Sequence, residues 1–367
     1  MRKISEEKIM HYKVSLDKAV SYFLSCQYPD GAFLSPEDMN DSQPYNCYTL
    51  LYLAGAFSAA RKYHDWLANN LIDPTDGLQR VLQDSVWATH TTYFKGWVAY
   101  GAHQCGFYDQ SIRVVGSLNR FIDHEHGGVY ITEKGAKRRS VTSFHHGAPV
   151  GMAMLITGNM REAHRIGEHM LRMLREQPEP HLSFYGYADG KTGDIITSGD
   201  LYDPPYLGAA GNEVIKVFDE YEMDTGHLCL DSRKDYQGWA ILGPPLNFMI
   251  GMYYATGDKR YLDGCLQLFE VFFNGRDHYS TNYISSCKIL QGLPQMYLET
   301  GDERIILSIE ELSDFLCNTQ NSKGFWGKDF LSGEELALKP EDQQQWIRIS
   351  QLGDCALSIA NVVKFMA

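Results

Sequence analysis

The chain has 367 residues, of which 44% are hydrophobic, and its formal net charge is −13 at pH 7. This length suits one large domain or two ordinary ones, and no low-complexity linker divides the sequence. The acidic excess argues against nucleic acid and against an anionic membrane surface as partners, because both are polyanions. No run of eighteen apolar residues is present, so no transmembrane helix is expected.

The eight cysteines are scattered singly, and none forms a Cys-x-x-Cys pair. A zinc ribbon or a thioredoxin-type motif is therefore not expected. No His, Asp or Glu cluster has metal-ligand spacing and no nucleotide motif is present, so we expect no cofactor. The first eight residues lack the apolar core of a signal peptide. We therefore expect a cytoplasmic protein, and its oligomeric state stays open.

Apolar residues recur at helical spacing along most of the chain, beginning with a helix over 12–26. Paired helices follow, each pair joined by a short turn, and a last helix is predicted over 345–366. Asn159, Asp258 and Asp302 are the expected N-caps of three second members. The predicted pairs are two helices within 46–70, then 87–104 with 107–123, 143–156 with 160–175, 236–255 with 259–274, and 283–299 with 303–318.

The two members of each pair differ in character. First members are rich in Gly, aromatic and small residues, as in 93–101, which is typical of a helix buried all round. Second members are amphipathic, as in 260–269, so we predict an inner and an outer ring. The N-terminal helix lacks an inner partner and the C-terminal helix lacks an outer one. The sequence therefore predicts an all-α fold: a single (α/α)6 toroid over residues 1–367, closed by its terminal helices.

A loose repeat marks the helix ends. A Gly followed by an aromatic or apolar residue returns roughly every forty to sixty residues, which indicates a hairpin that must stack on copies of itself. A Thr-Gly-Asn or Thr-Gly-Asp signal marks the opposite ends, at 157–159, 256–258 and 300–302. The glycine signals stand at Gly31, Gly77, Gly127, Gly186, Gly226 and Gly324.

One stretch, 177–234, does not follow the helical plan. It is rich in turn formers, with a polar run at 200–206 and one helix predicted near 206–222. Long insertions in compact domains are typically lids or binding loops. We therefore expect this insert to lie over the mouth of a central cavity.

At two places the chain resembles known α/α-toroid proteins. The run Gln27-Tyr28-Pro29-Asp30-Gly31-Ala32-Phe33 resembles the Gln…Asp-Gly-aromatic punctuation of terpenoid cyclases and protein prenyltransferase β subunits. The run Gln237-Gly238-Trp239-Ala240, followed by residues 255–262, resembles six-hairpin glycosidases such as unsaturated glucuronyl hydrolases. The resemblance covers most of the chain as a plan of helices. It implies the toroid fold and an enzyme with a central cavity.

The catalytic signatures of those families differ here. The Asp-x-Asp-Asp acid and the Asp-rich metal motif of the terpenoid enzymes are absent, and Asp354-Cys355 lacks the spacing of the prenyltransferase zinc set. The Arg-Gly-Gln-Gly-Trp run of the glucuronyl hydrolases here begins with Asp235-Tyr236. The shared motifs therefore specify the fold rather than the reaction.

Candidate site residues follow from this plan, because inner helices begin at one rim, where their N-termini favour negative charge. His145 and His146 lie at such a start, and a His pKa suits proton transfer near neutrality. The alternative is that these two histidines have structural roles, capping the helix or packing in the core. Asp235 is either an N-cap or an acid. The predicted catalytic set is His145, His146, His90, Tyr93 and Asp235. The predicted substrate-binding set is Tyr45, Asn46, Trp97, Tyr236, Trp239, Tyr283, Trp346, Arg348, Tyr202 and Asp203, with no metal ligand.

These residues predict a cofactor-independent acid–base cyclase, isomerase or lyase. Its partner would be a small terpenoid- or polyketide-like molecule in an aromatic-lined cavity, since the chain has 23 Tyr, 17 Phe and 6 Trp. A carbohydrate-active enzyme is the first alternative, and it needs two carboxyl groups, such as Asp235 with Asp200 or Asp203. A non-catalytic ligand-binding toroid is the second alternative.

Overall fold

The computed structural model describes residues 2–33, 45–73, 77–78, 91–131, 141–197, 229–234, 238–277, 284–326 and 341–367. Side chains are described for these residues except 73, 77, 78, 91, 284, 285 and 341–351. Within this part of the chain, no helix is both long enough and apolar enough to cross a membrane.

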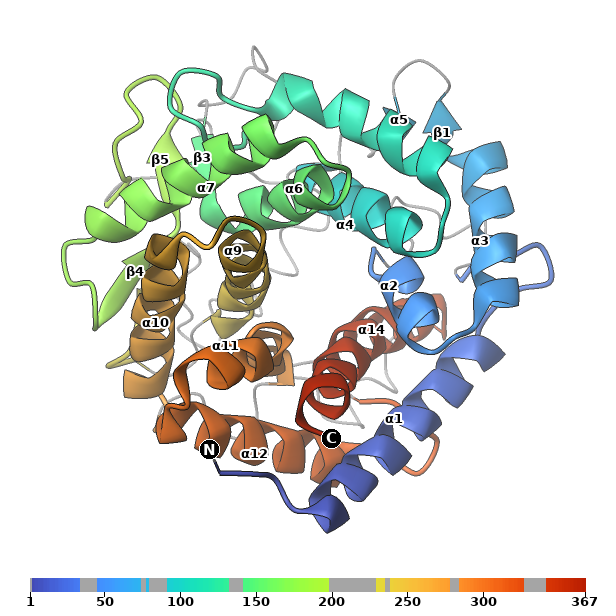
Figure 1. The fold of residues 1–367 in the computed structure, drawn as a ribbon. Coiled ribbons are helices and arrows are strands. Elements are labelled where there is room, and N and C mark those ends of the chain that lie inside the picture. Colours follow the sequence, from blue (N-terminus) through green and yellow to red (C-terminus); the bar gives the residue numbers. More distant parts are fainter. Residues whose placement is uncertain are drawn as a thin grey trace.

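Figure 1 shows two concentric rings of helices, in which each inner helix except the last one, α14, is followed along the chain by an outer one. The inner helices are α2 (Cys47–Leu53), α4 (Thr91–Gln104), α6 (Phe144–Ile156), α9 (Gly243–Thr256), α11 (Leu293–Thr300) and α14 (Glu341–Met366). The outer helices are α1 (Glu6–Ser25), α3 (Phe57–Asn70), α5 (Tyr108–Leu118), α7 (Met160–Arg175), α10 (Lys259–Asn274) and α12 (Glu303–Thr319).

Short elements join the helices. In the described residues, the 3₁₀ helix η3 (Asn119–Phe121) extends α5, η4 (Trp239–Leu242) precedes α9, and η5 (Ile284–Gln291) precedes α11. The described strands form antiparallel pairs, β1 with β2, β3 with β5 and β4 with β6. Their bounds are β1 (Ile72–Asp73), β2 (Gly77–Leu78), β3 (Val141–Ser143), β4 (Ser183–Tyr185), β5 (Tyr187–Asp189) and β6 (Cys229–Asp231).

The apolar core lies between the two rings. Inner helix α6 is buried from Phe144 to Met154 apart from His145, whereas outer helix α7 buries one face and exposes the other. This difference is the one that the sequence predicts for first and second members of a pair. The all-α toroid fold is confirmed.

The terminal helices close the ring, as predicted. Helix α1 packs against both α14 and α12, as Figure 1 shows. The Tyr12 hydroxyl donates to Asp314 Oδ1 of α12 at 2.7 Å, and Ser15 Oγ donates to Gln320 Oε1 at 2.9 Å. Helix α1 is therefore joined to α12 and its C-cap by polar contacts, and to the last helix, α14, by packing.

The Gly-aromatic repeat has a structural explanation at two of its sites. Gly31 and Gly324 have φ of 105° and 100°, and a Cβ on either would overlap a backbone carbonyl of the next outer helix. Gln27 Nε2 donates to the carbonyl of Gly31 at 3.1 Å and to that of Ala59 in α3 at 2.9 Å. Gln320 Nε2 makes the equivalent bonds, 3.0 Å each, to Gly324 and to Ser15 in α1. This Gln–Gly clasp fastens the end of one outer helix to its neighbour.

Several helix boundaries differ from the sequence prediction. Pro244, Pro245 and Pro294 fall in the first turns of α9 and α11, where no intrahelical N–H bond is lost, so these helices begin later than predicted. Helix α1 begins earlier, at Glu6, because Ser5 Oγ accepts from the backbone N–H of Lys8.

The predicted N-caps are confirmed at two of three positions. Asp258 and Asp302 each accept from a backbone N–H two residues on, at 3.0 and 2.9 Å. Asn159 occupies the cap position but makes no side-chain cap bond, and its amide nitrogen donates to Thr157 Oγ1 at 2.8 Å.

The described ends of the 177–234 insert are strands. β5 pairs with β3, the strand that leads into α6, and Phe144 N donates to Gly186 O at 2.9 Å. β4 pairs with β6 from the far end of the insert. The insert therefore fixes the start of α6. Residues 198–228, including the predicted 206–222 helix, lie outside the described residues.

Candidate active site

A buried ion pair joins two inner elements of the ring. Lys288 of η5 places its Nζ 2.8 Å from Oδ2 of Asp354 in α14, and their side chains are only 11% and 6% exposed. Burial alone would lower the pKa of Lys288, but the Asp354 carboxylate raises it, and the net shift is upward. Lys288 is therefore a buried ammonium ion. Such a charge is tolerated in a protein interior only when it is paired and hydrogen-bonded.

Two residues at the start of α2 complete the polar contacts of this ion pair. The Tyr45 hydroxyl lies 2.7 and 2.8 Å from the two Asp354 carboxylate oxygens and accepts from Lys288 Nζ at 3.0 Å. Asn46 Nδ2 donates to Asp354 Oδ1 at 3.0 Å. A Cβ at Gly353 would overlap the Asn46 amide, so glycine permits this close approach. Burial, with the Asp354 charge, raises the pKa of Tyr45 well above its ordinary value, which keeps it a phenol.

An aromatic wall extends from Tyr45 toward the start of α6. The Tyr45 ring lies edge-on to Tyr93 at 5.1 Å and 6.1 Å from Trp97, both on α4. Tyr93 in turn stacks on the imidazole of His145, with ring centroids 4.5 Å apart. The ion pair, the phenols and the imidazole are therefore contiguous. We call Tyr45, Asn46, Tyr93, Trp97, His145, Lys288 and Asp354 the central cluster.

The two adjacent histidines have different surroundings. His145 is half-buried, and its Nδ1 lies 3.1 Å from the carbonyl oxygen of Ile241 in η4. A carbonyl can only accept, so Nδ1 carries a proton, and in the neutral imidazole Nε2 is the acceptor nitrogen. His146 is 3% exposed, and its Nδ1 lies 2.8 Å from Oγ of Ser143, the residue that caps α6. His146 thus bonds to the helix cap, and its ring also lies edge-on to Tyr93, with centroids 6.0 Å apart.

The structure brings six of the predicted site residues together: Tyr45, Asn46, Tyr93, Trp97, His145 and His146. Trp239 is fully buried elsewhere, edge-on to Phe272 of outer helix α10 and against Gly275. The remaining predicted residues lie outside the described part of the chain: His90, Asp235, Tyr236, Tyr283, Tyr202 and Asp203, together with the side chains of Trp346 and Arg348.

Two members of the central cluster, Lys288 and Asp354, are absent from the predicted site. The sequence does hold a signal for them, because each is a charged residue inside an otherwise apolar stretch, Cys287 to Leu290 and Leu352 to Leu357. A charge in such a position needs a partner of opposite sign. That signal does not say which of the many charges in the sequence is the partner.

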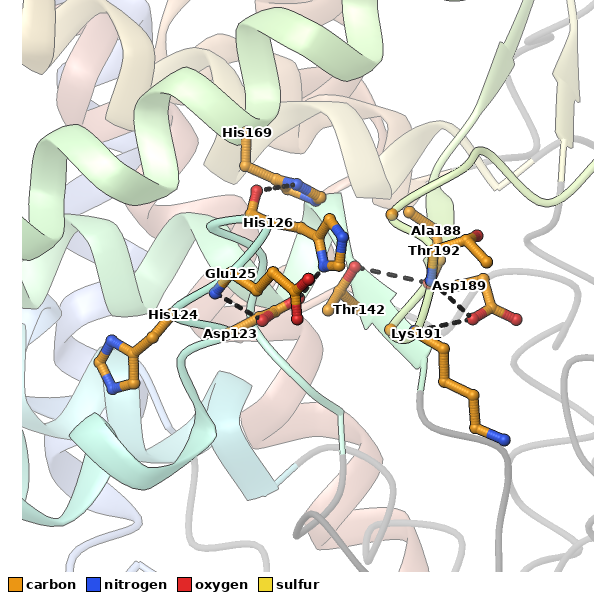
Figure 2. A network of polar contacts seen from close by, with 12 residues as sticks. Asp123, His124, Glu125, His126, Thr142, His169, Ala188, Asp189, Lys191 and Thr192 are labelled. Carbon is orange, nitrogen blue, oxygen red and sulfur yellow. Dashed lines mark hydrogen bonds and ion pairs between the residues drawn. The ribbon is translucent and has the colours of Figure 1, made fainter.

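A second polar network lies near the outer rim, beside β3 and β5 (Figure 2). Asp123 accepts from the backbone N–H of Glu125 at 3.0 Å and lies 3.0 Å from His126 Nδ1, so it shapes a tight turn. His169 Nδ1 lies 3.1 Å from the carbonyl of His126. These bonds serve local structure. In the described part of the chain, no three His, Cys, Asp or Glu side chains are placed to hold a metal ion.

A pocket of about 470 Å³ lies beside the start of outer helix α3. Its lining comes from the start of α3 and from the turn between α4 and α5, and the Arg61 guanidinium lies 4.5 Å from the Phe107 ring centroid. None of its lining residues belongs to the central cluster. The lining residues are Phe57, Ser58, Arg61, Cys105 and Phe107.

Comparison with known proteins gives structural matches only. No family model and no curated protein sequence matches the chain. A type II terpene cyclase, MstE from Scytonema, is 11% identical with a TM-score of 0.57, covering 99% of this chain and 100% of its own. A GH76A α-1,6-mannanase of Salegentibacter sp. HEL1_6 is 12% identical with a TM-score of 0.60, covering 95% and 98%. A GH76 α-mannanase of Bacteroides thetaiotaomicron is 12% identical with a TM-score of 0.56, covering 96% of both chains. At these identities the likeness concerns the fold, and the chain is an α/α toroid.

Proposed function

We propose that this protein is an enzyme that moves protons on a small organic substrate, as a cofactor-independent cyclase, isomerase or lyase. The observation that supports this most directly is the contact between His145 and Tyr93, which continues through Tyr45 to the buried Lys288–Asp354 pair. Imidazole is the side chain best suited to exchange a proton near neutral pH.

Each group has a distinct part in this proposal. His145 Nε2 takes or gives the proton, because Nδ1 is held by the Ile241 carbonyl. Tyr93, whose pKa burial raises although Lys288 opposes it, stays a phenol and holds the imidazole ring by stacking. Tyr45, Lys288 and Asp354 are positioning residues. They fix the wall behind Tyr93 and keep a preorganised dipole beside the reacting group.

The test is a screen of small organic acids, ketones and prenylated aromatics in D₂O, followed by mass spectrometry. We expect a substrate that gains solvent deuterium or rearranges, with a rate that His145→Gln lowers by about a hundred- to ten-thousand-fold. His164→Gln, on the exposed face of α7, is the matched control and should keep the wild-type rate. Equal turnover by His145→Gln and wild type would remove His145 from the mechanism.

A carbohydrate-active enzyme is the second candidate. The observation that supports this alternative is Asp354, a buried carboxylate beside the aromatic wall. Glycoside hydrolysis needs a second carboxyl, and the candidates for it, Asp235, Asp200 and Asp203, lie outside the described residues. Reducing-sugar release from α-1,6-mannan oligosaccharides, with no reaction in the organic screen, would favour this candidate. Ligand binding without turnover in either screen would favour the non-catalytic toroid.

A further inference from the structure

Gln291, the last residue of η5, has a polar side chain without a partner. Its side chain is 1% exposed, yet neither its amide nitrogen nor its amide oxygen has a hydrogen-bond partner in the structure. A buried amide left in this state costs about 1–3 kcal/mol for each unpaired group. A bound molecule that forms hydrogen bonds with the Gln291 amide would remove this cost.

The position of Gln291 relates it to the central cluster. In a 3₁₀ helix the side chains at i and i+3 eclipse, so Gln291 and Lys288 share one edge of η5. The rise of a 3₁₀ turn separates them by about 6 Å along the helix axis. Lys288 on that edge reaches Asp354 and Tyr45. Gln291 is therefore one turn further along the same edge as the ion pair.

The backbone at Gln291 is held firmly. Its carbonyl accepts from Asn361 Nδ2 of α14 at 3.1 Å. The next residue, Gly292, lies so close to Leu246 of α9 that a Cβ there would stand 2.7 Å from the Leu246 Cβ. Because α9 and α14 fix the chain on both sides, the amide cannot reach solvent by a small shift of the backbone.

We propose that Gln291 is a substrate-binding residue that pairs with a hydroxyl or un-ionised carboxyl group of the substrate. This rests on the proposed function and deepens it. An amide presents a donor and an acceptor together, and both groups of such a ligand offer the complementary acceptor and donor. The substrate then carries a polar group about one 3₁₀ turn from the Lys288–Asp354 pair, and its reacting carbon skeleton lies along the aromatic wall.

The first test needs no substrate and compares melting temperatures. Gln291→Met removes two unpaired polar groups at nearly constant volume, so the melting temperature should hold or rise. Gln177→Met is the matched control, because Gln177 is 6% exposed and both of its amide atoms are bonded, to Met173 O and to Tyr185 N and O. Its melting temperature should fall. An equal fall in both variants would show that Gln291 is bonded within the core and would overturn the proposal.

The second test uses phenol and toluene as probes, with binding followed by ligand-detected NMR. Phenol carries the hydroxyl that Gln291 is proposed to bind, and toluene has the same shape without it. We expect phenol to bind wild type about tenfold more tightly than Gln291→Met, the effect of one net hydrogen bond, with toluene unchanged. Phenol binding that is absent, or equal in both proteins, would show that Gln291 does not bind a ligand hydroxyl and would overturn the proposal. Neither test depends on turnover, so both remain decisive if the His145 assignment fails.

Discussion

At the centre of the ring, Lys288 and Asp354 carry opposite charges in surroundings that exclude water. Asp354 gains hydrogen bonds from Tyr45 and Asn46 as well as the ammonium, so its oxygens are well paired. Removing one partner of such a pair is far more costly than replacing both by apolar groups. The pair is thus a structural requirement of the site.

Single and double substitutions test this dependence. Lys288→Met should lower the free energy of unfolding by about 3–5 kcal/mol, because it leaves the Asp354 carboxylate buried without its cation. The double variant Lys288→Met, Asp354→Leu should recover most of that loss. Urea unfolding of the two single variants and the double variant measures the coupling. Additive losses would show that the two charges act independently.

His169 makes stability depend on pH. Burial, and then the neighbouring Arg172 guanidinium, lowers the pKa of His169 from 6.5 to about 4. The unfolded chain therefore binds a proton here at a higher pH than the folded protein does. The resulting stability is fully present above pH 6.5 and is lost as the pH falls toward 4.

We expect His169→Gln to flatten the pH dependence of the free energy of unfolding between pH 6.5 and 4. The wild-type contribution in that window is at most about 3 kcal/mol, from 1.36 kcal/mol per pKa unit. Urea unfolding at a series of pH values measures it, with the exposed His164→Gln on the same helix as control. Parallel curves for wild type and His169→Gln would rule out this source.

At the scale of elements, helical periodicity was sufficient to predict both rings, because each helix buries a face of fixed period. Helical periodicity could not place the starts of α9 and α11. A proline in the first turn of a helix and a proline at a kink inside a longer helix leave the same periodic pattern of apolar residues. The strand pairs β3–β5 and β4–β6 were also missed. Three-residue strands have too few residues to show alternation, and their partners are distant in sequence.

The Gln–Gly clasp gives a prediction at this scale. Gly31→Ala should destabilise the protein more than Gly55→Ala, although both positions have positive φ, of 105° and 65°. A Cβ at Gly55 meets nothing within 4 Å, so only backbone strain of about 1–2 kcal/mol is expected there. A Cβ at Gly31 also overlaps the Lys62 carbonyl of α3, so that helix must move. Equal melting temperatures for the two variants would show that the close approach has no energetic role.

For the whole molecule, the ring is closed only if α14 is present. Helix α14 packs against α1 and supplies Asp354, the partner of Lys288. Deleting residues 345–367 should therefore leave a buried ammonium unpaired and expose the apolar flanks of α1 and η5. We expect the truncated chain to lose cooperative thermal unfolding and to bind a hydrophobic dye. A truncated chain with the wild-type melting temperature would contradict closure by the terminal helices.

The candidate site could be predicted in part from this plan of the molecule. Polar residues at the starts of inner helices, such as Tyr45, Tyr93 and His145, were identifiable because a toroid brings those starts to one rim. Lys288 and Asp354 were not, because they lie further along their elements, and pairing them requires knowing how η5 and α14 face each other. Gln291 was missed for the same reason, since an unpaired amide is visible only once burial and neighbours are known.

The central claim is that the reaction takes place at the central cluster, and a crystal structure with the substrate found by the D₂O screen tests it most directly. The account predicts the substrate inside the ring, against Tyr93 and Trp97, with its exchanging atom about 2.6–3.2 Å from His145 Nε2. A substrate bound elsewhere, such as in the pocket beside Arg61, or out of reach of His145, would contradict it.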